Sequence, residues 1–288
     1  MEDTVFLNGE FMPRSQAQIS PDDRGFLFGD GLYEVTPAYG GQLLTLDRHL
    51  ARLQRGAQAL RLTIPEGLAD LHRELLHRNG LTEEEMSIVY LQVTRGTAPR
   101  THAFPDPPVP ATVYAWARAF PRPNPEDWSQ GYGAVTVPDR RGSRADLKTI
   151  QLLPQVLGQQ AAREAGETDA LLVRDGLALE GAHNNVFFVF DGVLATHPAS
   201  NQILPGITRE LVLEEARAAG IAAEERPIPL EEARGADEIL FTGTTTEVRP
   251  TTRLDGQPVG DGEVGPMARR LHELFLARVA RECGTVSV

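Results

Sequence analysis

Strand-like and helix-like segments alternate along this chain of 288 residues, and the alternation limits the fold more than any other feature. Apolar residues recur at spacings of three and four over residues 46–60, which indicates an amphipathic helix. Residues 87–94 and 185–190 are rich in the β-branched and aromatic residues that favour strands. Because both kinds of segment occur throughout the chain, the sequence predicts a mixed fold, α/β or α+β.

Turn and cap residues mark further boundaries. Asn8-Gly9, between two short apolar runs, predicts a hairpin. Thr45 is expected to cap the helix that follows it, and Asn79-Gly80 to end a second helix. Residues 19–31, rich in aspartate and glycine, are expected to turn tightly. Other expected elements are strands at 32–36, 111–117, 133–137, 170–173 and 238–241, and helices at 153–165, 208–219 and 264–281.

A proline-rich segment separates two regions of the chain. Residues 121–125 contain three prolines, and a chain of this length can form two domains, each with its own core. The sequence therefore predicts a small N-terminal α/β domain at 1–120, a linker at 121–125 and a larger C-terminal domain at 126–288.

Composition limits the partners. The net charge of −12 is unfavourable for a nucleic-acid groove, and no apolar run approaches the length of a membrane span. Cys283 is the only cysteine, so neither an intramolecular disulfide nor a cysteine-histidine zinc site is expected, and no metal site is predicted. The N-terminal residues show no signal peptide. We expect a cytoplasmic protein without nucleic-acid or membrane partners.

Lys148 is the only lysine among 28 lysine and arginine residues. Guanidinium groups stay protonated in proteins, whereas a lysine amine can lose its proton, attack a carbonyl group and form an imine. Lys148 is therefore a candidate nucleophile. The alternative is an accident of composition in a chain that favours arginine.

Three segments have the chemistry to hold an anionic cofactor. Residues 204–208 open a helix, whose N-terminus attracts phosphate, and residues 243–245 place hydroxyls and amides after a strand. Glu180 precedes a buried strand, where it can pair with a cationic group such as a protonated ring nitrogen. Each segment also has an ordinary structural explanation. Arg100 and His102, two residues apart in a long loop, either grip a carboxylate or are simply solvated.

The resemblance to a known family rests on six motifs. They occur in the order FGDGLYEV, TRGTAPRTHAFP, DLKTIQLL, LEGAHNNVFF, LPGITREL and FTGTTTEV. Together they resemble the class IV aminotransferases, fold-type IV enzymes that use pyridoxal 5'-phosphate, over about residues 4 to 280. The TRGTAPRTHAFP loop is similar to that of the D-amino-acid (D-alanine) aminotransferases within the class.

The resemblance implies a role for each matching position. Lys148 forms the internal aldimine, a Schiff base with the cofactor, and then moves a proton during catalysis. Glu180 pairs with the pyridine nitrogen, and Leu204 packs against the ring. The phosphate-binding positions implied are Arg52, Ile207, Thr208 and Thr244. Tyr33, Arg100 and His102 match the carboxylate trap of the family, in which the Arg and His come from the neighbouring subunit. The implied assembly is a homodimer, with two α/β domains per chain and the cofactor between them.

Two departures from the family pattern stand out. Ala182-His183-Asn184 replaces serines that often follow the glutamate, so cofactor retention is expected to depend on backbone amides, His183 or Asn184. Residues 140–145 lack the bulky aromatic of some D-amino-acid enzymes, which leaves the preferred substrate size open. Arg141 is the expected partner of Glu180.

The predicted reaction is ping-pong transamination. A D-amino acid such as D-alanine or D-glutamate gives its amino group to the cofactor, and a 2-oxo acid such as 2-oxoglutarate receives it. The alternatives are a branched-chain L-amino-acid aminotransferase and 4-amino-4-deoxychorismate lyase on the same fold. A silent cofactor-binding or interaction protein is a further alternative from another class.

Overall fold

A computed structural model describes residues 3–284, which form two compact units. Unit 1 contains residues 3–121, Leu147–Gln151 and 279–284, and unit 2 contains Arg122–Asp146 and Leu152–Arg278. The division after Pro121 lies inside the expected linker. The units are nevertheless not two contiguous ranges, because the segment that carries Lys148 belongs to unit 1.

Unit 1 contains a six-stranded sheet of order β2-β1-β6-β5-β3-β4, in which every neighbouring pair is antiparallel. The predicted hairpin is confirmed, because its two strands pair on either side of Asn8-Gly9. The predicted strand at 87–94 is also confirmed, whereas the one expected at 32–36 is longer. The strands are β1 (Thr4–Leu7), β2 (Glu10–Pro13), β3 (Gly31–Tyr39), β4 (Gln42–Leu43), β5 (Ser87–Thr94) and β6 (Thr112–Ala119).

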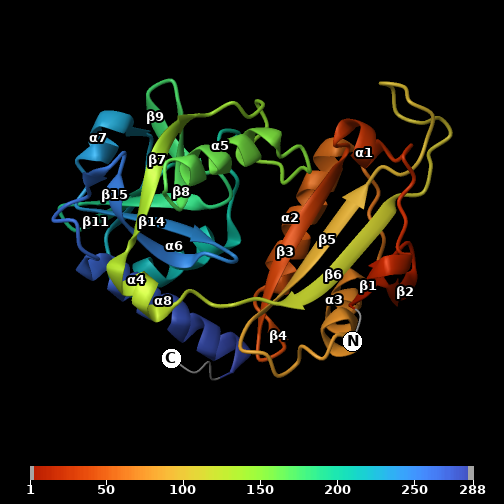
Figure 1. The fold of residues 1–288 in the computed structure, drawn as a ribbon, viewed down its shortest axis with the longest axis horizontal. Coiled ribbons are helices and arrows are strands. Elements are labelled where there is room, and N and C mark those ends of the chain that lie inside the picture. The colour runs from red at the N-terminus through yellow and green to blue at the C-terminus, as the bar shows by residue number, and fades with distance from the viewer. Residues whose placement is uncertain (1–2, 285–288) are drawn as a thin grey trace. The chain divides into compact units, whose positions relative to one another are not determined.

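Two amphipathic helices cover this sheet. α2 (Leu46–Leu60) lies along β3, and α3 (Leu68–Arg78) contacts β1, β5 and β6 (Figure 1). Several of their leucines, among them Leu53 and Leu75, are buried in one core with the strands. The predicted cap at Thr45 is wrong: Thr45 occupies the N-cap position in the left-handed conformation and makes no side-chain cap hydrogen bond.

The aspartate- and glycine-rich segment contains a short helix that the sequence analysis did not predict. α1 (Arg24–Phe28) begins where Asp23 Oδ1 accepts a hydrogen bond from the Gly25 amide at 2.7 Å. Asp23 Oδ2 also accepts from the hydroxyls of Thr94 and Thr112, at 3.1 and 2.6 Å. The helix is therefore fixed by contacts with β5 and β6, which lie far away in sequence.

Unit 2 contains a ten-stranded mixed sheet, with β7–β8, β7–β15 and β11–β12 parallel and the other pairs antiparallel. The path is β12-β11-β10-β14-β15-β7-β8-β9-β13, and β16 pairs with β15. The mixed α/β prediction is thereby confirmed. The strands are β7 (Tyr132–Pro138), β8 (Asp169–Arg174), β9 (Leu177–Gly181), β10 (Asn185–Phe190), β11 (Val193–Thr196), β12 (Ala223–Glu225), β13 (Ile228–Pro229), β14 (Glu238–Gly243), β15 (Glu247–Leu254) and β16 (Gln257–Pro258).

The central strands of unit 2 are apolar because both of their faces are covered. All residues of β10 except Phe190 are buried, as its apolar sequence predicts. The core combines Val186, Phe188 and Phe241 with residues of the neighbouring strands. The helices are α4 (Pro125–Gln130), α5 (Leu153–Glu164), α6 (Ile207–Ala218), α7 (Leu230–Arg234) and α8 (Pro266–Cys283).

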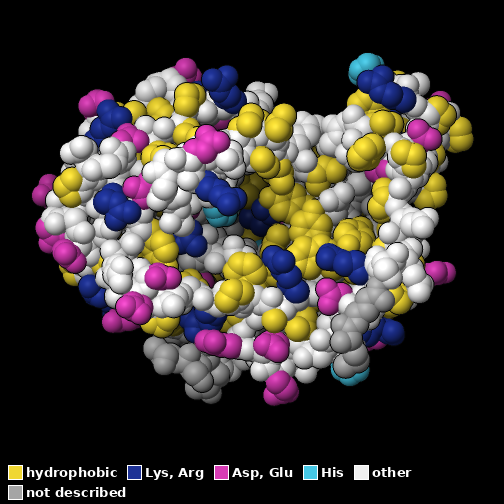
Figure 2. Space-filling model, viewed as in Figure 1, with side chains coloured by type: hydrophobic (Ala, Val, Ile, Leu, Met, Phe, Trp, Pro, Cys, Tyr) yellow, Lys and Arg dark blue, Asp and Glu magenta, His cyan; other side chains and the backbone are white. Residues whose placement is uncertain are grey.

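Exposed ion pairs are frequent in this arginine-rich chain. Acidic and basic side chains are interspersed on the face shown in Figure 2. Pairs such as Arg73–Asp70 and Arg234–Glu231 join neighbouring turns of one helix. Each such exposed pair contributes about 0–1 kcal/mol, so the buried arginine–carboxylate pairs matter more for stability and chemistry.

Candidate active site

The segment Leu147–Gln151 lies along the first residues of β3. The Tyr33 amide donates a hydrogen bond to the Lys148 carbonyl at 3.0 Å, and the Ile150 amide donates to the Gly31 carbonyl at 3.2 Å. Lys148 Nζ lies 4.2 Å from the centroid of the Tyr33 ring, where the face of the ring attracts a cation. The structure thus brings together the predicted nucleophile and one residue of the predicted carboxylate trap.

A buried ion pair involves the residue after Tyr33. Glu34 points to the opposite face of the strand, toward α2. Arg52 donates from Nε to Oε1 and from Nη2 to Oε2 of Glu34, both at 2.8 Å, and His49 Nδ1 lies 2.9 Å from Oε2. Burial alone would raise the pKa of Glu34, but the Arg52 charge and the hydrogen bonds from Arg52 and His49 outweigh it and lower that pKa. Arg52, predicted to bind phosphate, is therefore oriented by Glu34.

The loop between β5 and β6 carries Arg100 and His102, both exposed. The Arg100 guanidinium carbon lies 5.2 Å from the centroid of the Phe28 ring, and the His102 ring centroid lies 5.7 Å from it. Both predicted carboxylate ligands therefore meet on one aromatic side chain. Over residues 3–284, no hydrogen bond, ion pair or ring contact joins either of them to Tyr33, so the three do not form one cluster within a single chain.

Glu180 lies buried in β9 of unit 2. It accepts hydrogen bonds from Arg141 Nη1, from Asn185 Nδ2 at 2.8 Å and from the Leu204 amide at 3.0 and 3.2 Å. Burial raises the pKa of Glu180 to about 7, although the Arg141 charge opposes the rise. A carboxylate that is so costly to ionise gains much from another cationic partner. A protonated ring nitrogen would be such a partner.

The hydrogen bond to Glu180 confirms the predicted role of Arg141 as its partner. Arg141 donates hydrogen bonds to other acceptors besides Glu180. Nε and Nη2 each donate to Asp139 at 2.9 Å, and Nη2 also donates to the Gln202 carbonyl at 3.0 Å. Asp139 in turn lies 2.8 Å from Arg174 Nη2. Glu180 thus receives one hydrogen bond from an arginine that shares its charge with a second carboxylate.

Helix α6 begins without a capping side chain. Its N-cap residue is Gly206, and Ile207 and Thr208 in its first turn are buried. A first turn has free N–H groups and the positive end of the helix dipole, which suits a phosphate. A Cβ at Gly206 would lie 1.9 Å from Asn185 Oδ1, so the chain enters this helix in a space that only glycine fits. The donors at this site fit the phosphate of the implied cofactor.

Asn185 connects Glu180 to the segment before α6. Its Nδ2 donates to Glu180 Oε2 and, at 2.9 Å, to the Leu204 carbonyl. Asn185 also lies opposite Thr242 in the sheet, two residues before Thr244 in the turn after β14. Within unit 2, the predicted Glu180, Leu204, helix start and Thr244 therefore gather around one end of β10.

The residues that replace the serines differ in their surroundings. His183 is exposed, while Asn184 is buried and donates from Nδ2 to Asp169 Oδ1 at 2.7 Å. Asn184 Oδ1 has no hydrogen-bond partner among the described residues. The amide that donates to Glu180 belongs to Asn185, one residue further along the chain.

Sequence reasoning missed Glu34, His49 and Asn185 as part of these networks. A charged residue inside an otherwise apolar strand was a usable signal for Glu34, because a buried carboxylate needs a partner. The spacing of three residues between His49 and Arg52 puts both on one helix face. No sequence signal separates Asn185 from the preceding Asn184.

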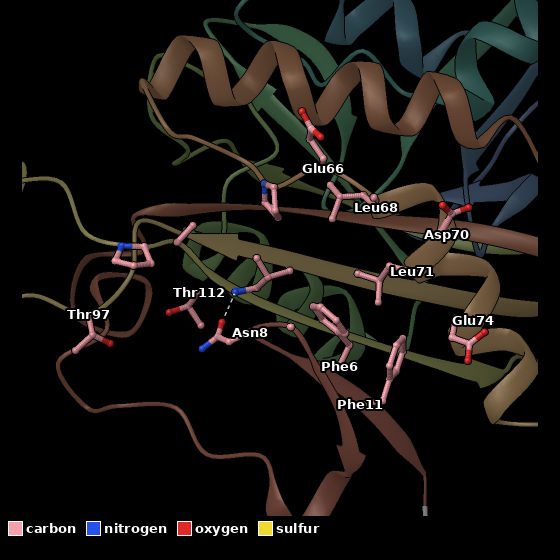
Figure 3. A pocket seen from close by; sticks show the side chains of 16 residues that line it. Phe6, Asn8, Phe11, Glu66, Leu68, Asp70, Leu71, Glu74, Thr97 and Thr112 are labelled. Atoms are coloured by element: carbon pink, nitrogen blue, oxygen red, sulfur yellow. Dashed lines mark hydrogen bonds between the residues drawn. The ribbon is translucent and has the colours of Figure 1, made fainter.

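The volume of a pocket does not identify the site. A pocket of about 910 Å³ in unit 1 is lined by side chains such as Phe6, Phe11 and Leu71, with Glu66 and Glu74 on the α3 side (Figure 3). None of the predicted cofactor or substrate residues lines it. A smaller pocket of about 210 Å³ is lined by Phe28, His102, Thr149 and Gln151, among others, next to the lysine segment.

Residues 3–284 contain no group of three or more His, Cys, Asp or Glu residues arranged to hold a metal ion. In the same part of the chain, every helix is too short or too polar to cross a membrane.

Comparisons with known proteins point in one direction. The family described as amino-transferase class IV matches residues 31–254. A D-alanine aminotransferase of Staphylococcus haemolyticus is 40% identical over 274 residues, which cover 94% of this chain and 96% of the relative. A D-alanine aminotransferase of Bacillus licheniformis is 40% identical over 268 residues, 93% of this chain and 94% of the relative.

Similar solved structures include a T.th. branched-chain amino acid aminotransferase with pyridoxamine 5'-phosphate. It is 27% identical, has a TM-score of 0.87 and covers 99% of this chain and 96% of its own. A branched-chain aminotransferase of Thermoproteus uzoniensis with norvaline is 27% identical, with a TM-score of 0.85 and coverage of 96% and 94%. Fold similarity thus links the chain to branched-chain enzymes, and sequence identity links it more strongly to D-alanine enzymes.

Proposed function

The chain belongs to the class IV aminotransferases, and from this we propose that it transfers the amino group of a D-amino acid to a 2-oxo acid, with pyridoxal 5'-phosphate as cofactor. D-alanine and D-glutamate are the proposed donors, and 2-oxoglutarate is the proposed acceptor. The observation that carries the proposal is the place of Lys148, the only lysine, on the ring of Tyr33. The 40% identity to D-alanine aminotransferases supports the D configuration.

Lys148 is the proposed catalytic residue. When bound, pyridoxal phosphate supplies an aldehyde that joins to an amine and a ring that accepts electrons from the substrate α-carbon. Lys148 Nζ would hold the cofactor and would serve as the base for the proton on that carbon. An amine must be neutral to accept a proton, so Lys148 has to give up its ammonium proton before it can act as a base.

The other proposed cofactor-binding residues would hold the ring and the phosphate and supply charge. Arg141 and Asn185 fix the Glu180 carboxylate. Glu180 would pair with the ring nitrogen and keep it protonated. The proposed phosphate ligands are Arg52, oriented by Glu34, and the first turn of α6 with Ile207 and Thr208. Thr244 adds a further phosphate contact, and Leu204 packs on the ring.

The proposed assembly is a homodimer in which Arg100 and His102 act at the neighbouring subunit's site and Tyr33 at its own. The separation of Arg100 and His102 from Tyr33 within one chain supports this arrangement. An exposed apolar stripe on α5 also supports association, with Leu153 67%, Val156 59% and Leu157 55% exposed. The cytoplasmic location stays a prediction from the sequence.

Branched-chain transamination is the second candidate, because the branched-chain structures share the fold at a TM-score of 0.87. An assay with D-alanine, L-alanine and L-leucine, each with 2-oxoglutarate, decides between them. We expect turnover with D-alanine and little with the L-amino acids. Preferred use of L-leucine would overturn the D assignment. Pyruvate release from aminodeoxychorismate without an acceptor would favour the lyase.

The Lys148→Ala variant tests the proposed nucleophile. The variant should lose the visible absorbance of the attached cofactor and nearly all turnover. Borohydride treatment of the wild-type enzyme should attach the cofactor permanently to one peptide, which mass spectrometry should map to residue 148. Turnover of the variant at the wild-type rate would contradict the assignment, as would modification at another position.

A further inference from the structure

Arg24 is a buried arginine that none of these roles uses. It is 3% exposed at the first position of α1. Its Nε donates to Asp30 Oδ2 at 2.9 Å, and its Nη1 donates to the Thr101 carbonyl at 2.7 Å. Its backbone amide donates to the Gly96 carbonyl at 2.9 Å. One residue therefore holds both the base and the middle of the loop between β5 and β6.

Phe28 is shared between Arg24 and the two predicted carboxylate ligands. The Arg24 guanidinium carbon lies 4.8 Å from the centroid of the Phe28 ring, against 5.2 Å for Arg100. The His102 ring lies 5.7 Å from the same centroid. The Phe28 carbonyl also accepts a hydrogen bond from Gln151 Nε2 at 3.3 Å, in the segment that carries the lysine. Movement of Arg24 would therefore disturb the surface on which Arg100 and His102 lie.

The base of the loop is closed. Asp23 and Thr97 form an isolated antiparallel bridge. A Cβ at Gly96 would lie 2.0 Å from the Pro110 carbonyl oxygen, so the outgoing and returning arms touch where only glycine fits. Because the base is fixed, the orientation of the tip depends on contacts made further along the loop.

Asp30 joins the Arg24 contact to a second anchor of the loop. Arg95 donates to Asp30 from Nε at 2.8 Å and from Nη2 at 2.9 Å, and its guanidinium carbon lies 3.7 Å from the centroid of the Phe104 ring. Arg61 lies 5.1 Å from the same ring. Burial opposes the ionisation of Asp30, but hydrogen bonds from Arg95 and Arg24 outweigh it and lower its pKa. The carboxylate therefore stays charged and bonded to both arginines.

We propose that Arg24 is a positioning residue that fixes Arg100 and His102 on Phe28, through its hydrogen bond to the Thr101 carbonyl, and thereby sets the affinity for the substrate carboxylate. This inference rests on the proposed function, in which Arg100 and His102 bind that carboxylate. Arg24 itself touches neither substrate nor cofactor. Its effect should appear mainly in KM, because Lys148 and the cofactor groups are left in place.

The first test compares Arg24→Ala, Arg24→Lys and the control Arg73→Ala, which removes an exposed arginine of α3. A charged hydrogen bond of this kind corresponds to a change of about 10- to 100-fold in affinity, so KM for D-alanine should rise by that factor in Arg24→Ala. The cofactor absorbance and kcat should change little. Arg24→Lys should restore part of the affinity, since an ammonium reaches one acceptor but does not span both. Arg73→Ala should behave as wild type.

Hydrogen–deuterium exchange of the holoenzyme provides a readout that does not depend on turnover. Amides of residues 97–105 should exchange faster in Arg24→Ala than in wild type, and those of β5 should not change. An unchanged loop with unchanged KM would overturn the proposal, and so would a fall in kcat alone. If the proposed function itself were wrong, wild-type enzyme would not use D-alanine at all. That result differs from a failure of the Arg24 role alone.

Mixed dimers test which site the loop serves. Lys148→Ala subunits and Arg24→Ala subunits carry different affinity tags, so that dimers with one subunit of each kind can be purified. Such a dimer has one site with an intact lysine, which receives the intact loop of the other subunit. It should be active with the wild-type KM. Activity with the raised KM of Arg24→Ala would show that Arg24 acts within its own subunit and would overturn its action across the dimer.

Discussion

Each unit contains a buried glutamate paired with an arginine, and the two pairs behave in opposite ways. In unit 1, Arg52 gives two hydrogen bonds to Glu34, and His49 adds a third contact. In unit 2, Arg141 gives Glu180 one hydrogen bond and gives its other donors to Asp139 and a carbonyl. The pKa of Glu34 is lowered, whereas burial raises that of Glu180 to about 7.

The difference shows that burial and an arginine neighbour do not decide the state of a carboxylate. For Glu34, the Arg52 charge and the hydrogen bonds from Arg52 and His49 offset the loss of water. For Glu180, the shared Arg141 does not offset it, and the Asp139 charge raises the pKa further. Glu34 is a fully compensated anion, suited to orient Arg52. The partners of Glu180 do not offset the cost of burying its charge, so a protonated ring nitrogen would stabilise that charge. One pair supports the structure, and the other supports the proposed chemistry.

The largest expected change is a loss of folding stability when Glu34, the partner of Arg52, is made neutral. Glu34→Gln leaves the buried Arg52 without its counter-charge, and loss of one partner of a buried pair costs about 3–5 kcal/mol. The free energy of unfolding, measured with urea, should fall by this amount. The matched control is Asp70→Ala, which breaks the exposed pair with Arg73 and should cost less than about 1 kcal/mol. Equal effects for both variants would contradict the comparison.

Glu180→Gln should have the opposite profile. Removing the charge that holds a ring nitrogen protonated should lower kcat roughly 100-fold, by analogy with the loss of other preorganised electrostatic groups. Stability at pH 8 should not fall, because the variant no longer buries a costly charge. The control Glu164→Gln, at the exposed end of α5, should retain full activity. A large loss of stability with unchanged kcat would reverse the roles assigned to the two pairs.

The smallest change, counted per unit of pH, is a stability slope in the cofactor-free protein. A carboxyl whose folded pKa of about 7 exceeds the ordinary value of 4.5 binds its proton more tightly in the folded state. The contribution of Glu180 to stability therefore falls as pH rises from 4.5 to 7, by up to about 1.4 kcal/mol per pH unit. Glu34, with its lowered pKa, contributes stability that is present above pH 4.5 and lost as pH falls further. Urea unfolding at pH 5, 6 and 7 should show the slope in wild type and not in Glu180→Gln.

Local sequence patterns predicted most of the helices and strands. Elements that depend on contacts between residues distant in sequence could not be predicted in this way. β5 follows from its β-branched and aromatic residues, and the end of α3 follows from Asn79-Gly80. α1 did not follow, because Asp23 fixes it against Thr94 and Thr112, far away in sequence.

The candidate site shows the same division. Lys148 was identified as the only lysine of the chain and by the motif around it, and the structure places the Tyr33 ring next to its amine. The partner of Glu180 was predicted as Arg141, but Asn185 was not, because its side chain reaches Glu180 and Leu204 only in the folded strand arrangement. Residue types in the sequence indicated the candidate functional side chains. Which partners stabilise their charges depends on how the chain packs.

A half-reaction without acceptor shows which configuration of alanine reacts at Lys148. Wild-type enzyme loaded with cofactor is mixed with excess D-alanine or L-alanine, and the visible absorbance of the bound cofactor is followed by stopped flow. We predict that D-alanine removes the band and releases about one pyruvate per site, while L-alanine leaves the band unchanged. Loss of the band with L-alanine alone, or with neither amino acid, would contradict D-amino-acid transamination through Lys148.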